Sequence, residues 1–380
     1  MIIVINAYSA RLGGGKTYLR NLLKHLPDDP TLDIRIFCPD DVQLPPDPRI
    51  TRAHSGWATA NPVIRTLWEM FGLPRYLASS GCDVLFCPGG VVATRAPKGV
   101  KVVTMFRNMT PFDPRAMEQI SFGLPLLRLK ILRHVFLKSL SEADLSIFIS
   151  NYARECIERL TKIPNPVTIP HGVGEDFRAK PENVPDQEIE HHQPYLVYVS
   201  KFDRYKHQRY VLQEFFAFNA LHNNTYSMVF IGEFDKFEYE SFSEALAQHE
   251  DSGKIIVKGH VPYDKLALWY GNAEAIIFAS SCENCPNILL ESLSSGKPVI
   301  CSDIAPMPEF GGDDILYFTP EQDGSLSDML KTAFANPDML AAAARAGEEQ
   351  SRKFTWTQTA ERTWRAITDL VAGHRTSIGT

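Results

Sequence analysis

The sequence predicts an α/β protein of two domains, each built on a doubly wound parallel sheet. Short apolar runs alternate with longer segments of helical period along almost the whole chain, which is typical of βαβ units. The alternation forms two series, separated by a polar segment with three prolines near residues 178–194. A length of 380 residues also exceeds what one ordinary core supports and suits two domains.

The first series predicts an N-terminal domain over residues 1–180. Its strand-like runs are short and mostly end in polar or turn residues; they are Ile2–Asn6, Ile34–Cys38, Val84–Cys87, Val100–Met105 and Leu145–Ser150. Segments of helical period lie between them, among them Thr17–His25, Pro62–Leu77 and Leu124–Leu140. This order predicts a parallel sheet with helices on both faces.

The second series predicts a C-terminal domain over residues 190–350, with the segment 178–194 as the linker. Its strand-like runs are Tyr195–Val199, Met228–Gly232, Ile255–Val257, Ala275–Ala279 and Pro298–Cys301. Its helix-like segments are Arg209–Leu221, Ser241–His249, Pro262–Tyr270, Asn287–Ser295 and Asp338–Ala346. Because ligands of open parallel sheets collect beyond the carboxyl ends of the strands, we expect the site in a cleft between the domains.

The composition argues against several classes of protein. Hydrophobic residues make up 44% and charged residues 22%, the profile of a globular protein. The net charge of −6 provides no basic field for nucleic acid, and no apolar run approaches the eighteen residues that suggest a membrane-spanning helix. The seven cysteines are scattered, which fits a reducing cytoplasm. Cys282 and Cys285 form a C-x-x-C, but without a second pair or clustered histidines it does not indicate a zinc site.

A glycine cluster, Gly13–Thr17, follows the first strand and precedes a helix. It nearly forms a P-loop, but Ala10 stands where that motif requires its first glycine. Backbone N–H groups at a helix N-terminus favour anions, so a phosphate site, a P-loop NTPase and a plain tight turn all remain possible interpretations.

Two lysines, Lys201 and Lys206, lie five residues apart just after the strand Tyr195–Val199. Cations at a strand's carboxyl end can stabilise the negative charge that develops on a departing diphosphate. A solvated basic loop is the alternative interpretation.

A third segment, Ser280–Ser292, runs from a strand through a loop into a helix. Pro286 suits the first position of that helix. Glu291 then lies little more than one turn inside it and could accept hydrogen bonds from ribose hydroxyls, while Glu283 in the loop could reach sugar hydroxyls. Two acidic residues at this spacing are commonplace by themselves.

Together these segments resemble the retaining glycosyltransferases of family 4 (glycosyltransferase group 1), which have the GT-B fold. The family signature is two glutamates separated by seven residues, matched here by Glu283 and Glu291. Further similar segments are Ser295–Ile300, Ile169–Val173, Val257–Val261 and Phe354–Trp356. The resemblance implies that the last helix, over residues 355–374, crosses back to the N-terminal domain, whereas packing of Trp356 and Trp364 on the C-terminal domain is the simpler alternative.

The resemblance also implies roles for individual residues. Lys201 and Lys206 take the diphosphate-binding positions, with Lys201 in place of the usual arginine, a change that keeps the charge but loses the guanidinium fork. Glu283 would bind the donor sugar and Glu291 the ribose. The remaining donor-binding positions are Gly14, Gly15, Ser200, Val261, Pro286, Asn287 and Ile288.

The N-terminal catalytic position departs from the family. At the end of the strand Val100–Met105, relatives often place a histidine followed by Asn or Asp, whereas this chain has Arg107 and Asn108. Arginine cannot act as a base at neutral pH, but it can bind sugar hydroxyls or phosphate. An ordinary strand-end turn is the alternative.

The expected reaction moves a hexose or deoxyhexose from a nucleoside-diphosphate sugar to a glycan or lipid-linked acceptor, with retention, in polysaccharide or lipopolysaccharide assembly. In the family's usual account the leaving diphosphate assists attack on the same face, so no protein nucleophile is needed. No Asp-x-Asp occurs in the sequence, so no metal or other cofactor is implied. The alternatives are a P-loop NTPase that uses Gly13–Thr17 and a non-catalytic GT-B protein that binds a sugar nucleotide.

The segment Leu124–Lys138 mixes leucine, isoleucine and phenylalanine with five basic residues. Such a helix can lie on an anionic membrane surface and bring the enzyme to a lipid-linked acceptor. We therefore expect a cytoplasmic protein with possible peripheral contact at the inner face of a membrane, and no nucleic-acid partner. A domain helix whose basic side chains reach past apolar surface to water is the alternative.

Overall fold

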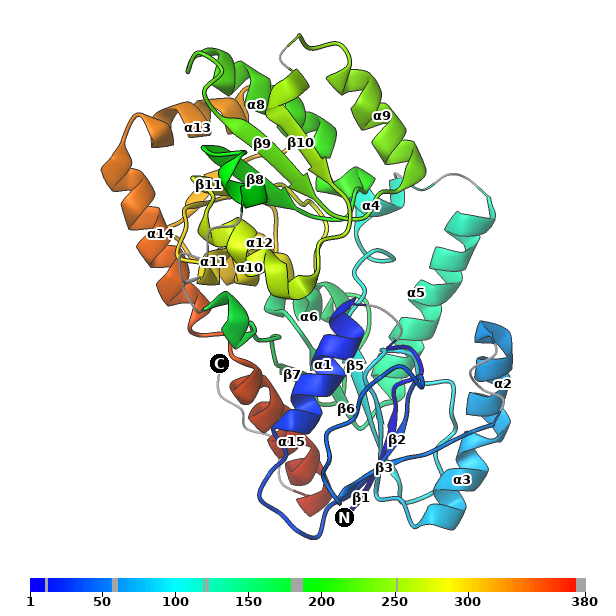
Figure 1. Ribbon diagram of the computed structural model, residues 1–380. Helices are drawn as coiled ribbons and strands as arrows, with labels where there is room; N and C mark the ends of the chain where they lie inside the picture. Colours follow the sequence, from blue (N-terminus) through cyan, green and yellow to red (C-terminus); the bar gives the residue numbers. More distant parts are fainter. Residues whose placement is uncertain are drawn as a thin grey trace. The chain divides into compact units, whose positions relative to one another are not determined.

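The computed structural model describes residues 1–10, 13–56, 61–118, 120, 123–178, 187–250 and 252–373. The chain forms two compact units. The first comprises Met1–Gly172 together with the C-terminal segment from Trp356, and the second comprises Val173–Thr355. Each unit is built on one parallel sheet with helices packed on it (Figure 1). The predicted α/β class with two doubly wound sheets is confirmed; of the predicted linker, residues 179–186 lie outside the described part.

The sheet of the first unit has seven strands in the order β3-β2-β1-β4-β5-β6-β7, all parallel. The strands are β1 (Ile2–Asn6), β2 (Asp33–Phe37), β3 (Ile50–Arg52), β4 (Val84–Cys87), β5 (Lys101–Phe106), β6 (Leu145–Phe148) and β7 (Pro166–Thr168). Every residue of β4 and β6 is buried, as expected for strands covered on both faces.

The helices of the first unit connect these strands. They are α1 (Gly13–Lys24), α2 (Pro62–Phe71), α3 (Leu73–Ser80), α4 (Pro114–Glu118), α5 (Leu124–Glu142) and α6 (Asn151–Glu158). The predicted helix over Pro62–Leu77 is interrupted at Gly72. A Cβ atom at Gly72 would lie 2.6 Å from Cδ1 of Trp68, so only glycine lets the chain turn this close to the tryptophan ring before α3 begins.

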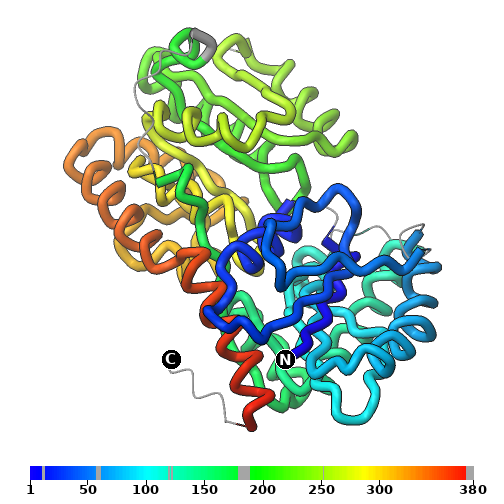
Figure 2. Tube along the Cα trace, turned by 60° about the horizontal axis from the view of Figure 1, so that its bottom comes forward, coloured from blue at the N-terminus to red at the C-terminus, as the bar shows by residue number. Residues whose placement is uncertain are grey.

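The last helix, α15 (Trp356–Ala372), belongs to the first unit. Figures 1 and 2 both draw it alongside α1. Trp364 is buried, and its Nε1 donates a hydrogen bond of 3.1 Å to the carbonyl oxygen of Leu22 in α1. The hydroxyl of Thr359 donates to the carbonyl of Pro170 at 2.8 Å. The predicted return of the last helix to the N-terminal domain is therefore confirmed.

The sheet of the second unit has six parallel strands in the order β10-β9-β8-β11-β12-β13. They are β8 (Tyr195–Val199), β9 (Ser227–Ile231), β10 (Ile255–Lys258), β11 (Ala275–Phe278), β12 (Val299–Ser302) and β13 (Leu316–Phe318). The helices are α7 (Gln187–Glu190), α8 (Gln208–Ala220), α9 (Lys236–Leu246), α10 (Tyr263–Gly271), α11 (Asn287–Ser294), α12 (Met307–Gly311), α13 (Ser325–Phe334) and α14 (Pro337–Ser351). Short 3-10 turns lie at η1 (Glu175–Phe177), η2 (Arg204–Lys206) and η3 (Ser252–Lys254).

Three strands were not predicted from the sequence: β3, β7 and β13. Each has three residues and lies at the edge of its sheet. Three residues are too few to show a period of two, and β7 begins with a proline, which is tolerated at a sheet edge.

The strand order reverses once in each sheet, between β1 and β4 in the first and between β8 and β11 in the second. Ligands of doubly wound sheets bind outside the carboxyl ends of the strands at such a point. None of the described helices is both long enough and apolar enough to span a bilayer.

Candidate functional site

The loops that follow β8 and β11 meet at the switch point of the second sheet. Lys206 ends the turn η2 after β8, and Glu283 lies in the loop between β11 and α11. Nζ of Lys206 forms an ion pair with Oε1 of Glu283. The two side chains are 9% and 17% exposed, so the pair is largely shielded from water. The structure thus joins two residues that lie 77 positions apart in the chain.

Aromatic rings complete the surroundings of Lys206. Its Nζ lies 5.2 Å from the ring centre of Tyr205 and 5.7 Å from that of Phe278, within the range of cation–π attraction. Lys201, the other predicted lysine, lies on the same loop but is exposed. Ser200 is buried at the start of this loop, where its amide donates to the carbonyl of Ile231 at 2.8 Å. Of the two predicted lysines, Lys206 is therefore the one held against Glu283.

His207, which the sequence analysis did not single out, connects the same two loops. Its backbone has the left-handed φ of 56°, and its side chain is buried. Nε2 lies 2.8 Å from Oγ of Ser281, two residues before Glu283, and Nδ1 lies 3.5 Å from Oε1 of Glu321. No pattern in the sequence indicates a left-handed backbone at a histidine. The sequence could have pointed to His207 only through its position directly after Lys206.

Glu291 lies inside α11 and is only 8% exposed. The hydroxyl of Tyr263, the first residue of α10, donates a hydrogen bond of 2.8 Å to its Oε1. Burial raises the pKa of Glu291 to about 7, and the hydrogen bond from Tyr263 opposes this rise. The carboxyl group is therefore poised to change charge near neutral pH. Tyr263 was not predicted as a site residue, because it is separated from Glu291 by a strand and a loop.

The predicted donor-binding residues Pro286, Asn287 and Ile288 lie at the beginning of α11. Pro286 caps this helix, and its carbonyl accepts a hydrogen bond from the amide of Leu290 at 3.1 Å. The amide of Asn287 donates to the carbonyl of Cys285 at 3.0 Å. The helix start thus follows directly on the loop that carries Glu283, and its dipole favours an anion there.

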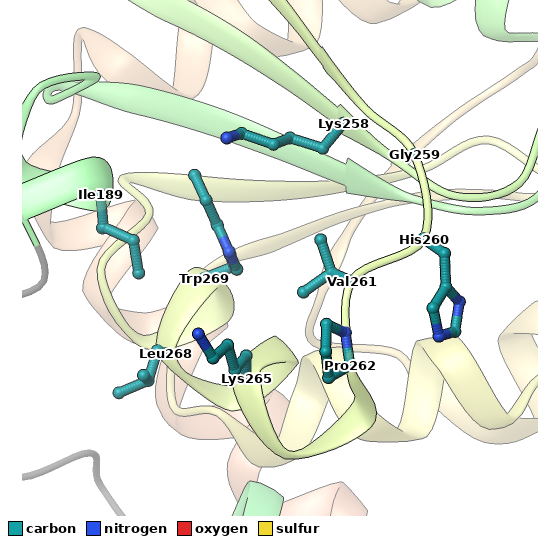
Figure 3. A pocket seen from close by; sticks show the side chains of 9 residues that line it. All are labelled: Ile189, Lys258, Gly259, His260, Val261, Pro262, Lys265, Leu268 and Trp269. Carbon is teal, nitrogen blue, oxygen red and sulfur yellow. The ribbon is translucent and has the colours of Figure 1, made fainter.

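A pocket of about 210 Å³ opens beside the loop that contains Val261 (Figure 3). Lys258 and the stretch Gly259–Pro262 line one side, and the α10 side chains Lys265, Leu268 and Trp269 line the other, with Ile189 of α7 at one end. At 100° per residue, these α10 side chains lie on the opposite face of the helix from Tyr263. Of the predicted donor residues, Val261 lines this pocket, whereas Glu291 contacts the far side of α10.

In the first unit, the glycine cluster starts α1. Gly13 has a positive φ of 37°, and Gly14 and Gly15 lie within the first turn of the helix. Lys16 forms an exposed ion pair with Asp41. A P-loop places its glycines in a loop before the helix and its lysine on phosphate. Here Gly14 and Gly15 are helical and the lysine pairs with a carboxylate, an arrangement that does not favour the NTPase alternative.

Arg107 follows the last residue of β5 and lies against α1. A Cβ atom on Gly15 would lie 3.6 Å from Nη1 of Arg107, and Cζ of Arg107 lies 5.5 Å from the ring centre of Tyr18. Tyr18 is fully buried and contacts the ring of His171 at 5.4 Å. The structure therefore brings two of the predicted features together, the glycine cluster and Arg107.

Asn108 has a local structural role. Its Oδ1 accepts a hydrogen bond of 3.1 Å from the amide of Thr110, which closes an Asx turn at the end of β5. This contact agrees with the strand-end turn that the sequence left open as an alternative. Arg107 is the residue of this pair whose functional group lies beside the glycine cluster.

The described residues contain no group of three or more His, Cys, Asp or Glu side chains arranged to hold a metal ion. Cys282 and Cys285 are both buried.

Family models match both parts of the chain. Residues 12–177 match the model described as Glycosyltransferase Family 4, and residues 179–350 match the model described as Glycosyl transferases group 1. Among curated proteins, the O-antigen chain mannosyltransferase B of Escherichia coli is 24% identical over 238 residues, which is 61% of this chain. The match spans 62% of the length of that relative.

Several solved structures superpose on almost the whole of this chain. A sucrose-phosphate synthase of Thermosynechococcus elongatus superposes with a TM-score of 0.74 at 18% identity, covering 98% of this chain and 100% of that one. HepE of Anabaena, solved with UDP and glucose, has a TM-score of 0.72 at 13% identity and covers 97% and 100%. A glycosyltransferase of Rickettsia africae has a TM-score of 0.70 at 16% identity and covers 97% and 98%. At these identities the likeness concerns the fold.

Proposed function

Because this chain belongs to the group 1 glycosyltransferases of the GT-B fold, we propose that it transfers a hexose or deoxyhexose from a nucleoside-diphosphate sugar to a glycan or lipid-linked acceptor, with retention. The observation that carries the proposal is the shielded Lys206–Glu283 pair beside the start of α11, with Glu291 one turn further on. The name of the Escherichia coli relative supports mannose as the sugar and the assembly of a polysaccharide such as O-antigen as the setting. The UDP and glucose bound by HepE support a nucleotide-sugar donor.

Each group in the second unit has a part in this proposal. The ammonium of Lys206 and the positive end of the α11 dipole hold the diphosphate and stabilise the charge that it gains as the sugar–phosphate bond breaks. Exposed Lys201 adds a second cation. Glu283 binds hydroxyls of the donor sugar, and the ionised carboxylate of Glu291 binds the ribose hydroxyls. With the diphosphate charge held by lysines and a helix terminus, we propose that the reaction needs no metal.

In the first unit, we propose that Arg107 binds a phosphate oxygen or a sugar hydroxyl. The guanidinium stays charged at neutral pH and has five donors, so it can hold an acceptor or donor oxygen but cannot remove a proton. The guanidinium lies beside Gly15 at the start of α1. Peripheral contact with a membrane through residues 124–138 would bring a lipid-linked acceptor to the enzyme.

A thermal-shift screen tests the donor site. Purified protein is heated with UDP-glucose, GDP-mannose, ADP-glucose or dTDP-rhamnose, and each ligand is repeated with Glu291→Ala and with Lys236→Ala. Lys236 is 82% exposed on α9 and serves as the matched control. A donor at a hundred times its Kd stabilises the folded protein by about 2.7 kcal/mol. We expect one nucleotide class to raise the Tm of the wild type and of Lys236→Ala, and Glu291→Ala to lose most of that shift.

Two results would contradict the proposal. If no sugar nucleotide raises the Tm, the donor site is wrong. If a sugar nucleotide binds but is neither hydrolysed nor transferred to any glycan or lipid-linked acceptor, the chain is a binding protein with this fold.

A further inference from the structure

Exposed apolar side chains gather on two helices of the first unit. Seven of the thirteen large apolar side chains that are exposed in the described residues lie on α2 and α5. Single exposed leucines are ordinary, but a contiguous apolar surface usually marks an interaction site. The surface formed by the exposed side chains of these two helices is called the α2–α5 face below.

On α2 the exposed side chains form a stripe. Val63, Leu67 and Met70 follow each other at helical spacing and are 70%, 44% and 46% exposed, and the neighbouring Phe71 is 56% exposed. The charged residues of α2 point elsewhere: Arg65 donates to the carbonyl of Tyr8 at 3.2 Å, and Glu69 is buried and accepts from Asn6 at 3.0 Å. This stripe therefore bears no charge.

On α5 the apolar side chains have cations beside them. Leu124, Leu127 and Ile131 are 81%, 54% and 57% exposed. Arg128 and Lys130 are exposed too, and at 100° per residue they fall on the two sides of this apolar stripe. No acidic residue occurs in α5 before Glu142, its last residue. The face of α5 is thus apolar in its centre and basic along its borders.

The two helices are hydrogen-bonded to one short segment of chain. The amide of Val92 donates to the hydroxyl of Ser139 in α5 at 3.0 Å, and the hydroxyl of Thr94 donates to the carbonyl of Glu69 in α2 at 2.8 Å. Because Val92 and Thr94 are two residues apart, α2 and α5 both contact this segment, and both stand at the right of Figure 1. Their exposed side chains therefore belong to one region of the first unit.

We propose that the α2–α5 face docks on a lipid bilayer that contains anionic phospholipid. The apolar stripes enter the boundary between headgroups and acyl chains, while Arg128 and Lys130 bind lipid phosphates, the arrangement expected of interfacial helices. A second copy of the chain fits less well, because a two-fold interface would bring the basic borders of two copies together. The inference extends the proposed function by naming the surface and the lipid class, and it is tested without any sugar donor.

Sedimentation with vesicles tests this docking. The full chain is mixed with vesicles of phosphatidylcholine alone or of phosphatidylcholine and phosphatidylglycerol at about three to one. We expect at least tenfold more protein to sediment with the anionic vesicles, and salt to weaken the binding because it screens the charges. The variants Leu127→Ser/Ile131→Ser, Val63→Ser/Leu67→Ser and Arg128→Glu/Lys130→Glu should each lose most of it. Phe237→Ser and Lys236→Glu, at exposed positions of α9 in the second unit, are the matched controls and should bind as the wild type does.

The outcomes separate the possibilities. If the three face variants keep the wild-type Tm and still sediment as strongly as the controls, the α2–α5 face does not bind lipid. If the wild type ignores both vesicles but forms dimers in analytical ultracentrifugation that the face variants abolish, the face is a protein interface and the inference is overturned. Either result leaves the donor-site proposal standing, because sugar-nucleotide binding is measured separately on the second unit.

Discussion

The hydroxyl of Tyr263 donates a hydrogen bond of 2.8 Å to the buried carboxyl group of Glu291. Burial raises the pKa of this group to about 7, and Tyr263 limits the rise by stabilising the ionised form. The carboxyl group that we propose to bind ribose is therefore partly protonated at neutral pH while the site holds no donor.

This pKa predicts how donor affinity depends on pH. The ionised carboxylate accepts hydrogen bonds from two hydroxyls, whereas the protonated form accepts them poorly, so affinity should rise through pH 7 and level off above it. Tyr263→Phe removes the bond that favours ionisation and should shift the midpoint to higher pH. Calorimetric titrations between pH 5.5 and 8.5 measure both effects. An affinity that is flat across this range would contradict the proposed role of Glu291.

The raised pKa of Glu291 also predicts how the stability of the folded protein changes with pH. A carboxyl group whose folded pKa lies above its unfolded value of 4.5 binds its proton more tightly in the folded state. The contribution of this group to the free energy of unfolding therefore falls by about 3 kcal/mol as the pH rises from 4.5 to 7. Glu291→Gln has no such proton. We expect the variant to gain stability relative to the wild type between pH 5 and pH 8 in denaturant titrations; equal curves would place the pKa near its ordinary value.

The contact between His207 and Ser281 predicts a coupled loss of activity. If this contact aligns the loops of Lys206 and Glu283, then His207→Gly, which keeps the left-handed backbone at little cost, should lower kcat about tenfold. Ser281→Ala should do the same, and the double variant should lose little more than either single variant. Asn223→Gly is the control, because Asn223 has a similar φ of 53° at an exposed turn. Additive losses would show that the two residues act separately.

The Lys206–Glu283 pair predicts a large effect on rate. Lys206→Ala removes the shielded cation that we place on the diphosphate and should lower kcat/KM by about 100-fold to 1000-fold. It also leaves Glu283, only 17% exposed, without its partner, so the protein should lose stability that Lys206→Ala/Glu283→Ala partly recovers. Lys201→Ala should cost less, because Lys201 is exposed. Equal losses for the two lysine variants would contradict the special place of Lys206.

Substitutions of Arg107 should affect activity, whereas substitutions of Asn108 should affect stability. Arg107→Ala should lower activity at least 100-fold with little change in Tm, because the guanidinium acts on a ligand. Asn108→Ala removes the cap on the amide of Thr110 and should lower stability by about 1 kcal/mol, while Asn108→Asp, which keeps an acceptor oxygen, should not. Steady-state rates and thermal melts of the three variants decide between these roles. A fully active Arg107→Ala would leave Arg107 with a structural role on Tyr18.

The close packing of Gly232 against the backbone of Ser200 predicts that the loop with Lys201 needs a glycine at position 232. A Cβ atom at this position would lie 2.0 Å from the carbonyl oxygen of Ser200, so Gly232→Ala must displace the start of the loop. We expect a loss of about 2 kcal/mol in stability together with weaker donor binding. At Gly259 a Cβ atom would lie 3.7 Å from Phe234, an ordinary contact, so Gly259→Ala should be close to wild type in stability. Equal melting curves for the two variants would refute this account.

Local sequence predicted many of the elements well, and its failures have physical reasons. The strands Ile2–Asn6 and Tyr195–Val199 coincide with β1 and β8, because a buried strand between helices leaves a continuous apolar run. The break at Gly72 was missed, because it depends on how closely the chain approaches Trp68. Likewise, no pattern in the segment Pro62–Leu77 showed that its apolar residues would stay in contact with solvent.

The sequence by itself determined which residues are candidates for the donor site. Glu283 and Glu291 share one strand–loop–helix segment, and Lys201 and Lys206 share another, so their order along the chain follows from local signals. Only the tertiary structure decided which of them touch. The pairing of Lys206 with Glu283 arises because β8 and β11 are neighbours in the sheet, although two strands lie between them in the sequence. Strand order and the burial that raises the pKa of Glu291 both result from packing of the whole unit, which no local pattern contains.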